Sequence, residues 1–414
     1  MIGYAEALEI LLREAPAPQV QRTAPAVGQV LAEAVASPEA LPPFDNSAMD
    51  GFALRVGPDG ASAGAEFDVR GAQAAGDAAA VAGQGAWEIM TGARVPDGLD
   101  AVIPVEQVAV LARGADGRPR RIRLNADLPM GQHIRCAGED VAAGALLLDR
   151  GVCLEAAQRM LLSAVGVAEV AAVRPPQLAL INTGRELVDD PGQSLASGEI
   201  RNSNGPYLAQ KIIDAGALLV RRATVGDDAD AFRAALRQSL DAGARLLLST
   251  GAVSMGRHDF VPDALRDLGA TIHFHKVRIR PGKPLLFATL PDGQLFFGLP
   301  GNPVSSAVGM RFFVEPVLRR MLGLPDERPL RLPLAEPYRK RHPLRFHLKA
   351  SVSVAANGRV LARILPGQES FRIAPMARSN AWIVLGEDIG DLDAGALVDV
   401  HGLSHWRGPQ LTGN

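Results

Sequence analysis

The chain has 414 residues, of which 47% are hydrophobic and 21% are charged, and this balance is typical of a globular protein and excludes a disordered or fibrous one. Its 43 Lys and Arg residues against 45 Asp and Glu residues give a formal net charge of −2, so no overall basic field favours nucleic acid or a membrane surface. The two cysteines, Cys136 and Cys153, support neither a disulfide framework nor a zinc site, which fits a reduced cytoplasm.

The first part of the chain shows two helical patterns separated by prolines. Residues 1–14 lack the basic start of a secretory signal and predict an amphipathic helix, with Tyr4, Leu8, Leu11 and Leu12 on one face. After a break at Pro16 and Pro18, a second helical pattern is carried by Val27, Val30, Leu31, Ala34 and Val35. The sequence holds no uncharged apolar run of about 18 residues, so we expect a protein that is neither secreted nor membrane-spanning.

Residues 42–140 form a predicted insertion of short strands and glycine-rich turns, which starts at the double proline Pro42-Pro43. Segments 19–41 and 141–174 flank this insertion, and the second of them contains a helical pattern over 154–165. We interpret the two flanking segments as one small mixed linker domain and the insertion as a mostly β domain.

From residue 175 the pattern changes to alternating strands and helices. Strands are predicted over 177–182, 218–225, 245–250 and 294–301, and helices over 207–217, 227–244, 260–270 and 302–323. Such alternation is typical of a doubly wound, mostly parallel sheet. We therefore assign residues 1–18 and 175–325 to one α/β domain, and predict an α/β multidomain fold for the whole chain.

Past Pro325 the pattern returns to β structure. The predicted strands 345–354 and 359–365 alternate apolar and polar residues on either side of an Asn357-Gly358 turn, and two more strands follow over 381–386 and 396–403. Residues 326–414 are thus predicted to form a small C-terminal β-barrel-like domain.

One candidate anion site is the run Ser249 to Gly251, directly after a buried strand. Glycine-containing turns at this place expose backbone N–H groups that can hold phosphate oxygens, although a turn without any ligand explains the residues as well. Asp259, a little further on, equally fits an N-cap of the next helix.

A second candidate is the sequence LPGNPVSS, Leu299 to Ser306. Asn302 and Pro303 begin a predicted helix whose free N–H groups, together with Ser305 and Ser306, suit an anion. A plain helix cap would explain Asn302 and Pro303 but leaves the rest of the string without a reason.

A third candidate is the basic segment KVRIRPGKP, which supplies Lys276, Arg278, Arg280 and Lys283 within eight residues. In an extended chain the first three of these side chains share one face, which suits a multiply charged oxyanion. The alternative is a solvated edge strand that carries charge against aggregation.

Carboxylates also occur near these motifs, at Asp45, Asp50, Asp140 and Glu186. Scattered carboxylates are usually surface residues, but beside a phosphate site they suggest Mg²⁺, which prefers a few carboxylates together with water and phosphate oxygens. The scattered His and Cys residues disfavour zinc, and the GxSxG turn of a serine hydrolase is absent from the sequence.

Several strings in this order closely resemble one family: DNSAMDG, MTGA, a TGxEL string, an STGxVSxG string ahead of HDF, IRPGKP and LPGNPVS. The family is the molybdopterin molybdenumtransferases, called MoeA in bacteria and represented by the C-terminal part of gephyrin. The resemblance covers roughly residues 1–325 well by motif order and the C-terminal β region less distinctly. It implies a homodimer of four-domain subunits with a cleft shared between protomers, which inserts molybdate into adenylylated molybdopterin with Mg²⁺ and releases AMP.

The resemblance also implies roles for single residues. The catalytic set that it implies is Asp50, Glu186, Asp259, Lys276 and Lys283. The implied Mg²⁺ ligands are Asp50, Glu186, Asp140 and Asp228. The implied binding set for the pterin phosphate and molybdate is Thr183, Gly184, Ser249, Thr250, Gly251, Ser254, Arg280, Pro300, Gly301, Asn302, Pro303 and Ser305. Contacts with a molybdopterin adenylyltransferase and with recipient molybdoenzymes are implied as well, and no nucleic acid or membrane is expected.

The chain departs from the family pattern at four places. Ala252 stands where Gly is usual, Arg257 where an acidic residue is usual, Arg280 where Lys is common and Arg185 where Asp is frequent. The added positive charge would either tighten anion binding or mark a specialised paralogue, including one that inserts tungstate. Two further alternatives are a non-catalytic pterin-binding scaffold and a nucleotide-pyrophosphate hydrolase.

Overall fold

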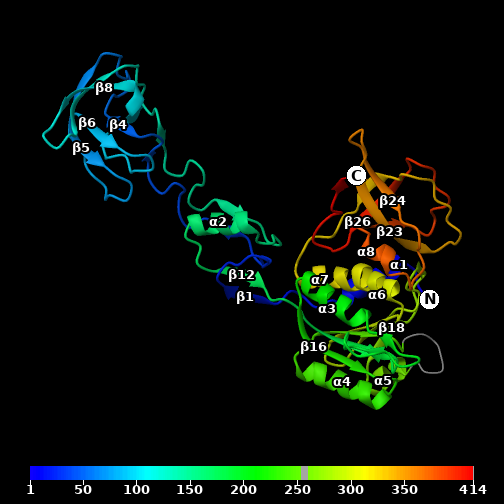
Figure 1. The fold of residues 1–414 in the computed structure, drawn as a ribbon. Helices are drawn as coiled ribbons and strands as arrows, with labels where there is room; N and C mark the ends of the chain where they lie inside the picture. Colours follow the sequence, from blue (N-terminus) through cyan, green and yellow to red (C-terminus); the bar gives the residue numbers. More distant parts are fainter. Residues whose placement is uncertain (253–259, 414) are drawn as a thin grey trace. The chain divides into compact units, whose positions relative to one another are not determined.

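The computed structural model describes residues 1–252 and 260–413 and divides them into two compact units (Figure 1). One unit contains residues 1–21 and 172–414, and the other contains residues 22–171. In the described ranges, none of the helices has the length and apolar character that crossing a bilayer requires. The finer division of the chain into four domains stays a prediction.

The first unit is built on a six-stranded sheet in the order β16-β13-β17-β21-β20-β18. Four strands are parallel: β13 (Gln177–Thr183), β16 (Leu218–Val225), β17 (Leu246–Thr250) and β21 (Leu295–Leu299). Two strands at one edge run antiparallel: β18 (Thr271–Phe274) and β20 (Leu286–Thr289). The predicted doubly wound, mostly parallel sheet is confirmed, whereas the antiparallel edge was not anticipated.

Helices cover both faces of this sheet. Neighbouring residues of each strand point to opposite faces, and because the central strands are apolar throughout, both faces must be buried. Leu246 and Leu248 pack with α3 (Asn204–Asp214), α6 (Pro303–Gly309) and α7 (Glu315–Met321). Leu247 packs with α4 (Ala229–Asp241) and α5 (Val261–Asp267). In Figure 1, α4 and α5 lie on the opposite face of the sheet from α3, α6 and α7. The N-terminal helix α1 (Tyr4–Glu14) joins the first of these two cores through Ala7 and Leu11.

The C-terminal strands form a second sheet within the same unit. Its members are β19 (Ile279–Arg280), β22 (Leu330–Pro333), β23 (Arg345–Val354), β24 (Val360–Ile364), β25 (Ala381–Leu385), β26 (Leu397–Gly402) and β27 (Thr412–Gly413). The predicted turn between β23 and β24 is present, with Gly358 at a φ of 78° and Asn357 accepting a hydrogen bond from the N–H of Arg359. This sheet has its own hydrophobic core.

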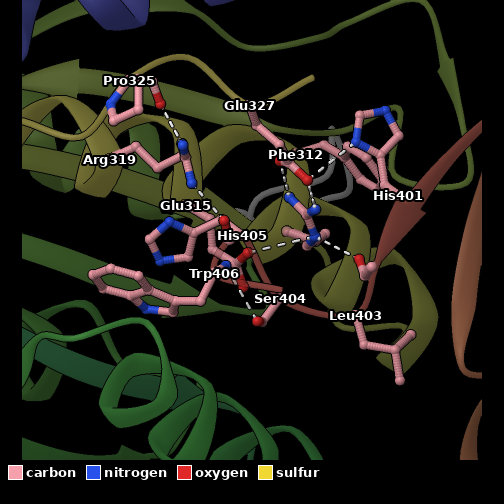
Figure 2. Close-up of polar contacts among 12 residues, drawn as sticks. Phe312, Glu315, Arg319, Pro325, Glu327, His401, Leu403, Ser404, His405 and Trp406 are labelled. Carbon is pink, nitrogen blue, oxygen red and sulfur yellow. Dashed lines mark hydrogen bonds and ion pairs between the residues drawn. The ribbon is translucent and has the colours of Figure 1, made fainter. Parts of the chain in front are cut away.

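A cluster of buried and half-buried charged residues centred on Arg311 connects the segment between α6 and α7 to the C-terminal sheet. Between α6 and α7 the chain forms one π-helical turn, Met310–Val314, which carries the buried Arg311. The Arg311 guanidinium donates to both carboxylate oxygens of Glu327 and to the carbonyl oxygen of Gly402 in β26. Its Nε lies 3.5 Å from the buried Glu315 carboxylate, which also pairs with Lys211 of α3 at 3.0 Å. Figure 2 shows Glu315, Glu327 and His401 gathered in this cluster.

The second unit contains a six-stranded sheet in the order β7-β4-β6-β5-β9-β8. The strands are β4 (Gly51–Leu54), β5 (Glu66–Gln73), β6 (Ala86–Ile89), β7 (Ala101–Pro104), β8 (Val108–Arg113) and β9 (Pro119–Leu124). The unit also contains two short antiparallel pairs, β3 (Asn46–Ser47) with β10 (Ile134–Arg135) and β2 (Val35–Ala36) with β11 (Leu146–Leu148). The predicted helix over 154–165 is present as α2 (Ala156–Ala164), and β1 (Val20–Thr23) pairs with β12 (Val170–Val173).

The predicted second helix, based on residues 27–35, is wrong. Gly28 adopts a φ of 89°, which a right-handed helix cannot contain, and its N–H donates to the carbonyl oxygen of Leu154. Val30 forms a β-bridge with Cys153, and the N–H of Leu31 donates to the carbonyl oxygen of Val152. Val30 and Leu31 are buried as the pattern implied, but pairing with a distant segment holds their backbone extended and wins over a short, weak helix.

Candidate active site

A cavity of about 670 Å³ opens at the carboxyl ends of β13, β17 and β21. This is the edge of an α/β sheet where ligands usually bind. Eight residues of the predicted set line the cavity: Thr183, Gly184, Glu186, Thr250, Gly251, Gly301, Asn302 and Pro303. The structure therefore brings three of the sequence motifs together, although they are separated by more than 50 residues along the chain.

The floor of the cavity is a set of strand ends tied to one another. Thr183 Oγ1 donates to the carbonyl oxygen of Thr250 at 3.0 Å, and the N–H of Gly251 donates to the carbonyl oxygen of Leu299 at 3.1 Å. Gly251 has a φ of 87°, and a Cβ atom added there would lie 2.6 Å from both the carbonyl oxygen and Oγ1 of Thr183. Only glycine fits this close approach, so its presence in the motif has a steric reason.

The next residue, Ala252, also has a positive φ, of 49°. Alanine rarely adopts this left-handed conformation, for which glycine carries no steric penalty. The family departure at this position therefore coincides with local backbone strain. Ser254, Arg257 and Asp259 lie outside the described residues.

The loop before α6 forms another wall. Asn302 occupies the N-cap position and Pro303 the first position of α6, as predicted, but the Asn302 side chain makes no capping hydrogen bond. Asn204 Nδ2 donates to the carbonyl oxygen of Gly301 at 2.7 Å, and Ser306 Oγ donates to that of Pro300. In this described region Ser305, Pro300 and Ser249 are buried and lie outside the cavity lining, so these three side chains support the wall from behind.

Two carboxylates line the cavity, Glu186 and Asp227. Both oxygens of Glu186 lie over Gly184, where an added Cβ atom would approach them to 2.7 Å. Asp228, one of the predicted ligands, accepts the N–H of Ala231 at Oδ1 (2.6 Å) and thereby caps α4. Sequence reasoning chose the second aspartate of the pair, whereas the first one lies on the cavity wall.

The basic segment lies along the surface rather than in the cavity wall. Val277 and Ile279 are buried, whereas Arg278 and Arg280 are exposed and Lys276 is half-buried, so the three residues predicted to share one face alternate with buried ones. Lys283 is exposed as well. Ile279 and Arg280 form the edge strand β19, which pairs with β23. The segment still packs near the cavity, because a Cβ atom at Gly282 would lie 3.4 Å from the Ser305 carbonyl oxygen in α6.

In the second unit, the predicted Asp50 joins two of the quoted motifs. Its Oδ1 accepts hydrogen bonds from the N–H (2.7 Å) and hydroxyl (2.9 Å) of Thr91 in MTGA, and these bonds lower the pKa of the Asp50 carboxyl. The next residue must be glycine, because a Cβ atom at Gly51 would lie only 1.9 Å from the carbonyl oxygen of Ile103. Asp45 of the same motif accepts the N–H of Ala137, close in sequence to the exposed Asp140.

Several cavity residues were not found from the sequence. Arg201 ends the short strand β15 (Ile200–Arg201), and Asn202, Ser203 and Asn204 follow it. Phe371 and Ile373 come from the C-terminal region. The helix signal at Asn204-Gly205-Pro206 could have pointed to the first group, whereas the second group carries no motif. Over residues 1–252 and 260–413, no three His, Cys, Asp or Glu residues gather as a ready-made metal site.

Comparisons with known proteins cover almost the whole chain. Residues 2–166 match the family model of the MoeA N-terminal region (domain I and II), residues 179–320 that of a probable molybdopterin binding domain, and residues 331–403 that of the MoeA C-terminal region (domain IV). The molybdopterin molybdenumtransferase of Synechococcus elongatus is 38% identical over 97% of this chain and 100% of its own length. Molybdopterin molybdenumtransferase 2 of Mycobacterium tuberculosis is 36% identical over 92% of this chain and 93% of its own length.

The solved structures agree. A molybdopterin biosynthesis MoeA protein from Pyrococcus horikoshii superposes with a TM-score of 0.78 at 26% sequence identity, over 97% of this chain and 99% of its own. With the motifs, the cavity and these matches in agreement, the chain belongs to the MoeA family of molybdopterin molybdenumtransferases.

Proposed function

We propose that the protein inserts molybdate into adenylylated molybdopterin, releases AMP and leaves molybdenum on the dithiolene sulfurs of the pterin. The observation that carries this proposal is the meeting of the Thr183–Glu186, Thr250–Gly251 and Gly301–Pro303 segments around one cavity. Its floor is backbone-rich and glycine-lined, which suits the approach of phosphate oxygens, and carboxylates stand on its wall.

The cavity residues fit a role for Mg²⁺. Glu186 and Asp227 supply two carboxylates beside a phosphate-sized space, and Mg²⁺ commonly takes one or two carboxylates with the remaining positions filled by water and substrate phosphate. The ion would neutralise negative charge on the phosphoanhydride. Asp50, Asp140 and Asp228 are further candidate Mg²⁺ ligands on the family resemblance, and we add Asp227 because it lines the cavity.

The protein's own side chains would bind and position the reactants. Lys276, Arg280 and Lys283 would hold the molybdate dianion, since Arg and Lys favour oxyanions. Thr183, Gly184, Thr250 and Gly251 would fix the phosphate end of the pterin, with the buried Ser249 behind them. Holding the two reactants together lowers the barrier by positioning, without a covalent enzyme intermediate.

The proposal includes the assembly and the cell context. A homodimer with a cleft shared between protomers, work in the cytoplasm, and contacts with the adenylyltransferase and with recipient molybdoenzymes all rest on the family resemblance. The preference between molybdate and tungstate is left to experiment, because the two dianions have the same charge and nearly the same shape.

One assay tests the reaction. AMP release from adenylylated molybdopterin is measured with molybdate and Mg²⁺, with tungstate and Mg²⁺, and with neither oxyanion. The transferase predicts release that depends on an oxyanion. A scaffold predicts pterin binding without AMP release, and a nucleotide-pyrophosphate hydrolase predicts AMP release that is the same in all three reactions.

A further inference from the structure

A loop of the C-terminal region, residues 367–373, is tied by hydrogen bonds to β23 and to the start of α6. Lys349, which is fully buried, donates from Nζ to the carbonyl oxygens of Glu369 (3.2 Å) and Arg372 (3.1 Å). The Gln368 side chain bonds to both the N–H and the carbonyl oxygen of Lys349. At the cavity, the N–H of Val304 in α6 donates to the carbonyl oxygen of Ser370 at 3.0 Å.

This fixed loop presents Phe371 at the cavity. The Phe371 side chain is 64% exposed, although its neighbours in the chain are anchored, so it contributes little to any hydrophobic core. It lines the cavity together with Ile373, and among the lining residues that the structure describes it is the single aromatic one. The Arg372 guanidinium lies 5.8 Å from the ring centroid.

The lining of the cavity therefore includes two chemically different kinds of surface. Thr183, Thr250 and Gly251 contribute polar groups and tightly turned backbone, and Phe371 with Ile373 contributes apolar surface. A phosphorylated pterin has the same division, with an anionic tail and a flat heteroaromatic ring system. Flat heteroaromatic rings bind well on exposed aromatic side chains that are already held in place.

We propose that Phe371 is the stacking platform for the pterin ring and thereby fixes the orientation of the substrate in the cavity. This inference rests on the proposed function, since it assumes that the cavity takes the pterin. Phe371 would act on substrate binding and alignment, and it takes no part in breaking the phosphoanhydride.

The test uses the full chain and a stable probe, 6-hydroxymethylpterin phosphate in its oxidised form. Binding is followed by titration calorimetry, and ring stacking by the upfield NMR shift of the pterin H7 proton, which senses the ring current of an aromatic face. The variants are Phe371→Ala, Phe371→Leu and Phe371→Tyr. Leu397→Ala, on the exposed end of β26, is the matched control for loss of an exposed apolar side chain.

We expect the Ala and Leu variants to bind the probe about tenfold more weakly and to lose the upfield shift of H7. Phe371→Tyr should keep the shift and an affinity within about twofold of wild type, and Leu397→Ala should match wild type. Equal H7 shifts in wild type and Phe371→Leu would overturn the stacking inference. Oxyanion-dependent AMP release by the wild-type protein, measured separately, decides the proposed function, so the two failures can be told apart.

Discussion

Glu327 is expected to stabilise the first unit in a strongly pH-dependent way. Its carboxylate accepts two hydrogen bonds from Arg311, a residue only 1% exposed, and lies 3.4 Å from His401 Nδ1 (Figure 2). Partial burial raises the pKa of Glu327, but the hydrogen bonds and charges of His401 and Arg311 outweigh it and lower the pKa to about 2, from an ordinary value of 4.5. Each pH unit corresponds to about 1.4 kcal/mol, so the ionised carboxylate contributes about 3 kcal/mol at neutral pH.

The sign follows from linkage. Because the folded-state pKa is the lower one, this contribution is fully present above pH 4.5 and is lost as the pH falls towards 2. Glu327→Gln should therefore lower the free energy of unfolding of the first unit by about 3 kcal/mol at pH 7. Less than half of this difference should remain at pH 3.

The assay can be confined to one unit because the tryptophans are well placed. Of the three in the chain, Trp382 and Trp406 belong to the first unit and Trp87 to the second. In a Trp87→Phe background, tryptophan fluorescence during urea unfolding reports the first unit alone. Asp326→Asn, at the adjacent exposed carboxylate, is the matched control and should change little. If Glu327→Gln lowered the free energy of unfolding by the same amount at pH 3 as at pH 7, the reasoning would be refuted.

Three further predictions concern the cavity. Gly251→Ala should destabilise the first unit by more than about 2 kcal/mol and abolish AMP release, because the new methyl group would lie 2.6 Å from Thr183 and residue 251 has a positive φ. A variant that is as stable as wild type in urea unfolding would contradict this expectation. Ala252→Gly should relieve backbone strain in the folded state but raise the conformational entropy of the unfolded state, and the two effects oppose each other. The free energy of unfolding should therefore change by less than about 1 kcal/mol, and AMP release should be kept. Asp228→Ala should lose about 1 kcal/mol of stability through the lost cap and keep AMP release, whereas Asp227→Ala should keep its stability and lose AMP release. Loss of AMP release in Asp228→Ala but not in Asp227→Ala would show that Asp228 is the ligand.

The sequence predicted the α/β sheet well because its strands are buried on both faces and its helices have a clear apolar stripe. β13, β17 and β21 are almost wholly buried, and the expected and observed bounds agree within a few residues. The pattern at residues 27–35 failed because apolar spacing reports burial, whereas the backbone partner of Val30 is Cys153, which lies more than 100 residues away. Local periodicity contains no information on such a partner.

The candidate site likewise contains residues that the sequence predicts and residues that it does not. Motif residues such as Gly251 and Asn302 were predictable because their turn geometry depends on their own short segment. The contribution of Phe371 was not predictable from the sequence, because it depends on the contact of the C-terminal region with α6 through Ser370 and Val304. The choice between Asp227 and Asp228 also required the structure, since either one could have capped α4.

The position of α1 has a consequence for how the chain folds as it is synthesised. Tyr4 contacts Phe313 and His347, with ring centroids 5.3 Å and 5.9 Å away, so α1 packs against residues that are synthesised more than 300 positions after it. At ordinary translation rates that is a wait of roughly 15 to 60 s. Residues 22–171 form one uninterrupted stretch and can close their own core in the meantime. We therefore expect nascent chains stalled near residue 200 to protect the second unit from proteolysis while α1 is still digested.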